Sequence, residues 1–140
     1  MPLVSTVVEV DGYKLLDGGI ADSIPLKFME EKGYDKNIVI LTQTSDYKKK
    51  KNKLLFLMKL LMKKYPGVVK AMSVRHDEYN KTADYVRKKE KTGEILVIRP
   101  KEKLPVGRIE RNPDNLKKAY EIGRKTALEK LDEIKKFYEQ

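Results

Sequence analysis

Residues 15–26 read Leu15-Leu16-Asp17-Gly18-Gly19-Ile20-Ala21-Asp22-Ser23-Ile24-Pro25-Leu26, and this stretch decides how the rest of the chain is interpreted. A short apolar segment, residues 13–16, runs directly into the carboxylate of Asp17 and two glycines. This pattern predicts a buried strand end followed by a turn in which the glycines adopt positive φ angles. Because a strand fixes the residue at its end and the loop exposes it, Asp17 is a candidate functional residue. The alternative is a structural turn in which Asp17 caps its own backbone.

The same stretch resembles the Asp-Gly-Gly/Ala block of the patatin-like phospholipases. Later segments are similar, in the same order, to the C-terminal half of bacterial members of that family. The similar segments are residues 33–42, 47–50, 75–80, 98–100 and 106–110. The resemblance covers most of the chain, but only the Asp-Gly-Gly block is specific.

The resemblance implies an activity and a site. In that family the Asp of the block is the second member of a Ser-Asp dyad that hydrolyses lipid or other acyl esters. By matching positions this role falls on Asp17, with Gly18 and Gly19 shaping its turn. The family uses no metal or nucleotide cofactor, so none is expected here. The implied fold is the C-terminal portion of a three-layer α/β/α hydrolase.

The sequence departs from the family pattern at the nucleophile. A Gly-x-Ser-x-Gly elbow needs its glycines because the strained strand-to-helix turn leaves no room for side chains. The serines of this chain are Ser5, Ser23, Ser45 and Ser73, and none has those flanking glycines. We therefore expect a C-terminal part of a serine acyl-hydrolase, inactive alone, whose partner is the N-terminal half of the same enzyme. Whether it is a proteolytic product, an artificial fragment or one chain of a two-chain enzyme stays open.

Alternating strand and helix patterns predict an α/β fold with a mainly parallel sheet and helices on both faces. Residues 38–41 and 95–98 are continuous apolar runs, which are typical of central parallel strands. We expect residues 1–111 to form the hydrolase portion and residues 112–140 an amphipathic helix packed on it. Uncovered strands at residues 3–8 and 15–16 would favour a homo-oligomer. The remaining expected elements are strands at 4–10 and 13–16 and helices at 25–32, 52–65 and 73–91.

Charge is unevenly distributed along the chain. The net charge is +10, yet residues 1–47 carry four lysines against eight acidic residues. There is no cysteine, and no apolar stretch reaches the ~18 residues of a membrane span. These features predict a cytoplasmic protein, with peripheral contact at the inner membrane face as a further expectation. His76 is the single histidine, so no metal site is expected.

Residues 48–64 hold eight lysines and no acidic residue. A basic amphipathic helix can lie in a membrane interface, which suits a lipid hydrolase. The alternatives are a helix packed on the core with solvated lysines, and a non-catalytic α/β interaction or regulatory domain that binds an acidic membrane. Nucleic-acid binding is not expected, because no recognition motif is present. The candidate membrane-facing residues are Lys48, Lys49, Lys50, Lys51 and Lys53.

Overall fold

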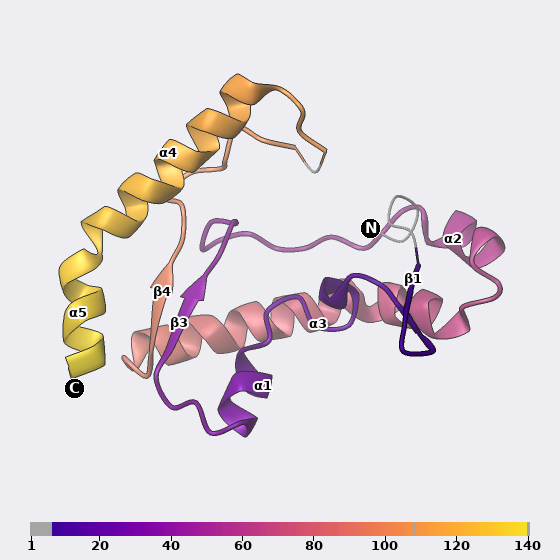
Figure 1. Ribbon diagram of the computed structural model, residues 1–140, viewed down its shortest axis with the longest axis horizontal. Helices are drawn as coiled ribbons and strands as arrows, with labels where there is room; N and C mark the ends of the chain where they lie inside the picture. The colour runs from indigo at the N-terminus through magenta and orange to yellow at the C-terminus, as the bar shows by residue number, and fades with distance from the viewer. Residues whose placement is uncertain (1–6, 108, 140) are drawn as a thin grey trace. The chain divides into compact units, whose positions relative to one another are not determined.

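The computed structural model describes residues 7–107 and 109–139 (Figure 1). The strands are β1 (Val8–Val10), β2 (Tyr13–Leu15), β3 (Asn37–Ile40) and β4 (Ile95–Ile98). A short 3₁₀ helix, η1 (Gly18–Ile20), follows β2. The α-helices are α1 (Leu26–Glu31), α2 (Leu55–Leu61), α3 (Pro66–Lys91), α4 (Pro113–Glu129) and α5 (Leu131–Glu139).

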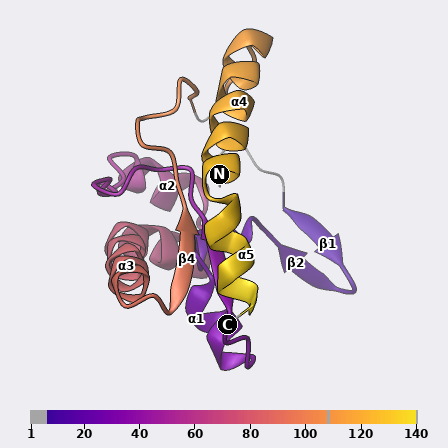
Figure 2. The same cartoon turned by 90° about the vertical axis from the view of Figure 1, so that its left-hand side faces the viewer.

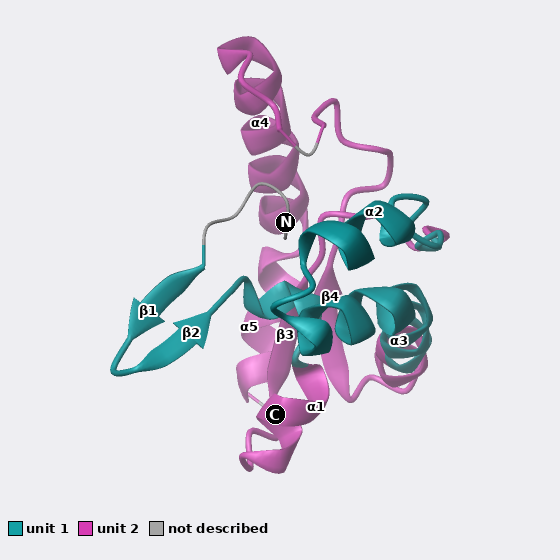
Figure 3. Ribbon diagram, turned by 90° about the vertical axis from the view of Figure 1, so that its right-hand side faces the viewer, with its two compact units in different colours: residues 1–25, 48–85 teal, residues 26–47, 86–140 magenta. Residues whose placement is uncertain are grey.

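The chain forms two compact units (Figure 3). The first unit comprises residues 1–25 and 48–85, and the second comprises residues 26–47 and 86–140. Helix α3 contributes to both, because the boundary falls between Tyr85 and Val86.

Strands β1 and β2 form an antiparallel hairpin in the first unit (Figure 2). Asp11 and Gly12 connect them, with φ angles of 50° and 78°. Positive φ at both central residues is what a two-residue hairpin turn requires, because its twist then matches that of the strands. These two positive φ angles lie in the hairpin turn, which ends five residues before Asp17.

Methionines dominate the core of the first unit. Met58 of α2, Met62 just after α2, and Met72 of α3 pack with Ile20, which ends η1. Unbranched methionine side chains adapt to irregular gaps between short elements. The partly buried residues around this cluster are Leu16, Leu55, Tyr65, Val68, Val69 and Ala71.

Strands β3 and β4 pair in parallel in the second unit, with Asn37 opposite Ile95 and Ile40 opposite Ile98. Val39, Ile95 and Val97 are buried, and α1 packs against β3. Ile40 is 73 % exposed, so the last residue of β3 is not covered.

The expectation of a mainly parallel, three-layer α/β/α fold is wrong for this structure. The described residues contain one antiparallel and one parallel sheet, each of two strands, and most of their regular structure is helical. The two apolar runs pair with each other, but no described strand extends their sheet on either side. A continuous apolar run indicates that both faces of a strand are buried, but it does not show whether helices or further strands cover them.

Two helix boundaries also differ from the sequence prediction. The sequence predicts helices at 52–65 and 73–91, but α2 already ends at Leu61 and α3 begins at Pro66, a position where the fixed φ and missing N–H of proline are tolerated. The expected C-terminal helix begins as predicted, since the Asn112 side chain accepts a hydrogen bond from the Asp114 N–H. It then divides at Lys130 into α4 and α5.

Candidate functional site

Asp17 lies at the N-terminus of η1, immediately after the hairpin. Its Oδ1 accepts a hydrogen bond from the Gly19 N–H at 2.9 Å, and its carbonyl oxygen accepts one from the Ile20 N–H at 3.1 Å. Asp17 therefore does cap its own backbone, as the alternative interpretation expected. The residue is exposed and follows an exposed strand, so the predicted buried strand end is wrong.

The two glycines after Asp17 serve a different purpose from the one expected. Neither Gly18 nor Gly19 has a positive φ angle, so the predicted reason for them is wrong. A Cβ atom on Gly19 would lie 3.2 Å from Asp17 Oδ1 and 3.7 Å from Arg75 Nη2. A Cβ atom on Gly18 would meet nothing within 4 Å. Close approach of side chains restricts position 19, whereas position 18 borders open space.

Two side chains hold the turn from outside. Arg75 of α3 donates from Nε to the Gly19 carbonyl oxygen at 2.8 Å, and Ser23 donates from Oγ to the same oxygen at 2.8 Å. Sequence reasoning did not assign either residue to the site. Arg75 is distant in sequence, although it lies in one of the segments noted above for their resemblance, residues 75–80.

A cavity of about 310 Å³ opens beside the turn. Asp17 and Gly18 form part of its wall, Lys14 supplies the cation, and the rest is largely apolar. A carboxylate fixed next to an apolar cavity can accept a hydrogen bond from a hydroxyl group while the cavity receives a hydrocarbon chain. The other lining residues are Val7, Leu16, Ile20, Ala21, Tyr65, Gly67, Val68 and Ala71.

The described residues supply a carboxylate but not a complete catalytic set. Ser23 is engaged with the Gly19 carbonyl oxygen, and no cluster of three or more metal-ligating side chains occurs among residues 7–107 and 109–139. His76 lies beside Asp77, with 3.4 Å between Nε2 and Oδ1, and its Nδ1 is buried without a hydrogen-bond partner.

The predicted basic residues do not form a uniform surface. Lys48, Lys50, Lys51 and Lys53 are exposed and precede α2. Lys49 is held instead by α3: its N–H donates to Asn80 Oδ1 at 2.8 Å, and its Nζ lies 4.5 Å from the centroid of the Tyr79 ring. None of the helices in the described part of the chain is long and apolar enough to cross a membrane.

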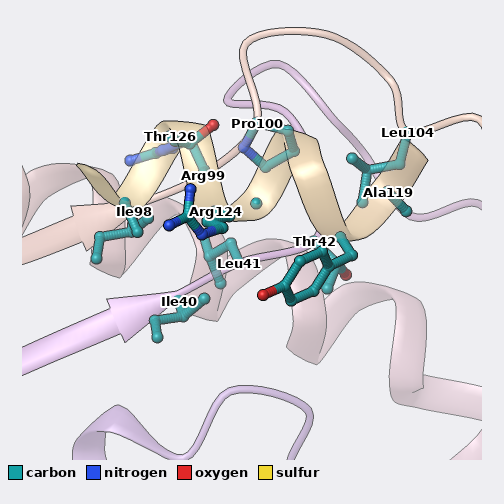
Figure 4. A pocket seen from close by; sticks show the side chains of 13 residues that line it. Ile40, Leu41, Thr42, Ile98, Arg99, Pro100, Leu104, Ala119, Arg124 and Thr126 are labelled. Atoms are coloured by element: carbon teal, nitrogen blue, oxygen red, sulfur yellow. The ribbon is translucent and has the colours of Figure 1, made fainter. Parts of the chain in front are cut away.

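The second unit contains a larger, apolar cavity of about 500 Å³ (Figure 4). It lies between the ends of β3 and β4 and one side of α4, and its lining includes Ile40, Ile98, Ala119 and Ala127. Arg99 at its edge forms an ion pair with Glu90. The sequence predicts only that residues 112–140 form an amphipathic helix packed on the rest of the chain, so it gives no indication of this cavity.

Residues 65–139 match the family model described as Domain of unknown function (DUF6363). The chain belongs to the DUF6363 family. No curated protein and no solved structure matches the chain.

The DUF6363 match divides the candidate site. It includes Arg75 and the residues from Tyr65 to Ala71 that line the smaller cavity, but it does not include Asp17. The DUF6363 segment therefore contributes the side chain that anchors the turn, and the preceding residues contribute the carboxylate.

Proposed function

We propose that Asp17 is the acidic member of a Ser-Asp dyad, and that the chain is the C-terminal part of a patatin-like serine acyl-hydrolase. The similarity of residues 15–26 to the Asp-Gly-Gly block suggests this activity. The observation that carries the proposal is the exposed Asp17 carboxylate, oriented by the Gly19 N–H at 2.9 Å beside an apolar cavity. A cytoplasmic location is part of the proposal and agrees with the absence of cysteine from all 140 residues.

In the proposed reaction the N-terminal half of the enzyme supplies a seryl hydroxyl. The serine oxygen attacks the ester carbonyl carbon, the bond to the alcohol oxygen breaks, and the proton passes to the departing alcohol. Water then releases the acyl group from the serine. Asp17 accepts the hydrogen bond of the attacking hydroxyl and orients it.

The surroundings of Asp17 suit an acyl ester. The mainly apolar walls of the 310 Å³ cavity provide a site for part of an acyl chain. Arg75 acts as a positioning residue. Its hydrogen bond to the Gly19 carbonyl oxygen holds Gly19 in place, and the N–H of Gly19 in turn orients the Asp17 carboxylate.

The experiment compares two aspartates in the longer polypeptide encoded in frame upstream of Met1. Asp17→Asn preserves the shape of the side chain and removes its charge, and kcat for a p-nitrophenyl ester should fall by about 10²–10⁴. Asp22→Asn is the matched control, because Asp22 also caps a nearby turn, accepting from the Ile24 N–H at 3.1 Å. It should leave kcat unchanged.

Four results would contradict the proposal. An unchanged kcat for Asp17→Asn, or an equal loss for Asp22→Asn, would make Asp17 a turn residue only. Ester hydrolysis by the purified 140-residue chain would show that the nucleophile lies elsewhere. An upstream reading frame without a glycine-flanked serine would remove the other half of the dyad.

A further inference from the structure

Helix α2 is apolar except at Lys59, yet only one of its sides is buried. Met58 is 2 % exposed and packs with Met62 and Ile20 in the core of the first unit. Phe56 and Leu60 are one helical turn apart, on the side opposite these methionines, and are 83 % and 54 % exposed. A helix that needed only to pack on its own core would carry polar residues there.

The exposed side is continuous along the helix. Leu57 and Leu61 form a second pair with the same spacing, and Leu54 precedes the helix. All three are exposed, so five large apolar side chains gather on a segment of eight residues, 54–61. Together Leu54, Phe56, Leu57, Leu60 and Leu61 are called the α2 apolar face below.

Cations surround this face, and acidic residues are absent from its neighbourhood in sequence. No Asp or Glu occurs between Asp46 and Asp77. Lys53, Lys59, Lys63 and Lys64 are exposed at the ends and along the side of α2. Apolar side chains bordered by lysines complement a lipid surface, where the apolar groups enter the acyl boundary and the ammonium groups contact phosphates.

We propose that the α2 apolar face docks onto the surface of an anionic bilayer, with Phe56 and Leu60 inserted and the surrounding lysines on lipid phosphates. Lys49 does not take part, because Asn80 and Tyr79 hold it. The buried side of α2 meets Ile20, three residues after Asp17. Docking would thus place α2 between the bilayer and the turn that carries Asp17, and lipid binding itself does not depend on the proposed Ser-Asp chemistry.

The test is sedimentation of the 140-residue chain with vesicles of phosphatidylcholine alone or of phosphatidylcholine mixed equally with phosphatidylglycerol. We expect binding to the anionic vesicles only, weakened by added salt. The double variant Phe56→Ser/Leu60→Ser should bind at least tenfold more weakly. Leu116→Ser/Leu128→Ser is the matched control, because both residues are exposed on α4, and it should bind like the wild type.

A lysine series tests the electrostatic part. Lys59→Gln/Lys63→Gln should weaken binding by roughly fivefold for each lysine removed. Lys117→Gln/Lys118→Gln on α4 has the same change in charge and should have little effect. Circular dichroism checks that the variants keep their helices, which is expected because all the substituted side chains are exposed.

Several outcomes would overturn the inference. These are no binding to anionic vesicles, equal binding to both vesicle types, or equal weakening by the α2 and α4 variants. Light scattering of the protein alone provides a separate criterion: a dimer that Phe56→Ser/Leu60→Ser dissociates would identify a second copy as the occupant. Loss of esterase activity in Asp17→Asn with unchanged vesicle binding would leave the inference intact, so the two proposals can fail independently.

Discussion

Arg75 donates a hydrogen bond from Nε to the carbonyl oxygen of Gly19 at 2.8 Å, across 56 positions of sequence. This contact connects α3 to the turn that carries Asp17. Arg75 lies within the DUF6363 segment and Gly19 lies outside it. The arrangement of the candidate carboxylate therefore depends on a side chain from another part of the chain.

We expect Arg75→Ala to lower the free energy of unfolding by about 1–2 kcal/mol, because it leaves a partly buried carbonyl oxygen with one donor fewer. Urea denaturation of the 140-residue chain measures this change. Lys70→Ala, an exposed position on the same helix, should change stability by less than about 0.5 kcal/mol. Equal effects of the two substitutions would show that the Arg75 contact contributes nothing.

The two glycines of the turn should respond differently to alanine. Gly19→Ala places a methyl group 3.2 Å from Asp17 Oδ1 and disturbs the cap, whereas Gly18→Ala meets no atom within 4 Å. We expect Gly19→Ala to be less stable than Gly18→Ala by about 1 kcal/mol, the usual value of a capping hydrogen bond. Urea titrations of both variants test this difference. Identical urea midpoints and slopes for the two variants would mean that the Asp17 carboxylate moves away from the new methyl group with no loss of stability.

Acid should weaken the start of α4. The N–H of Asn112 and the side chain of Asn115 donate to the Glu110 carboxylate and lower its pKa below the ordinary value of 4.5. Because the folded-state pKa is depressed, the stabilising contribution is complete above about pH 4.5 and is lost as pH falls through the folded-state value. Carbon NMR of the Glu110 carboxyl group should therefore give a midpoint below 4.5.

The variant Glu110→Gln supplies the control for that titration. It retains an oxygen acceptor and removes the ionisation, so α4 should lose part of its dependence on pH between neutrality and pH 3. A wild-type midpoint at or above 4.5 would contradict the prediction.

Local features of this fold could be predicted from the sequence where one short stretch contains all the participants. The cap at Asn112 is such a case, since Pro113 and Asp114 complete it. The parallel pairing of residues 37–40 with residues 95–98 also agrees with their apolar pattern. The number of strands could not be predicted, because an apolar run does not state which elements bury it.

The candidate site was predictable only in part. The Asp-Gly-Gly stretch located a turn, but the close approach of Arg75 to Gly19 depends on how α3 packs. Sequence spacing does not report such a contact. The same limitation applies to Lys49. The charge pattern groups it with the neighbouring exposed lysines, but in the structure it contacts Tyr79 and Asn80 of α3.

Each of the two units is built from two separate segments of the chain, so few positions divide the chain without dividing a core. The backbone passes from one unit to the other three times, after Pro25, after Tyr47 and after Tyr85. A recombination event at Tyr65, where the family match begins, would separate Met72 from Met58 and Ile20 and would leave half a core behind. The start of the DUF6363 match therefore falls inside the first unit, and a segment that began there would lack Met58 and Ile20 of this core.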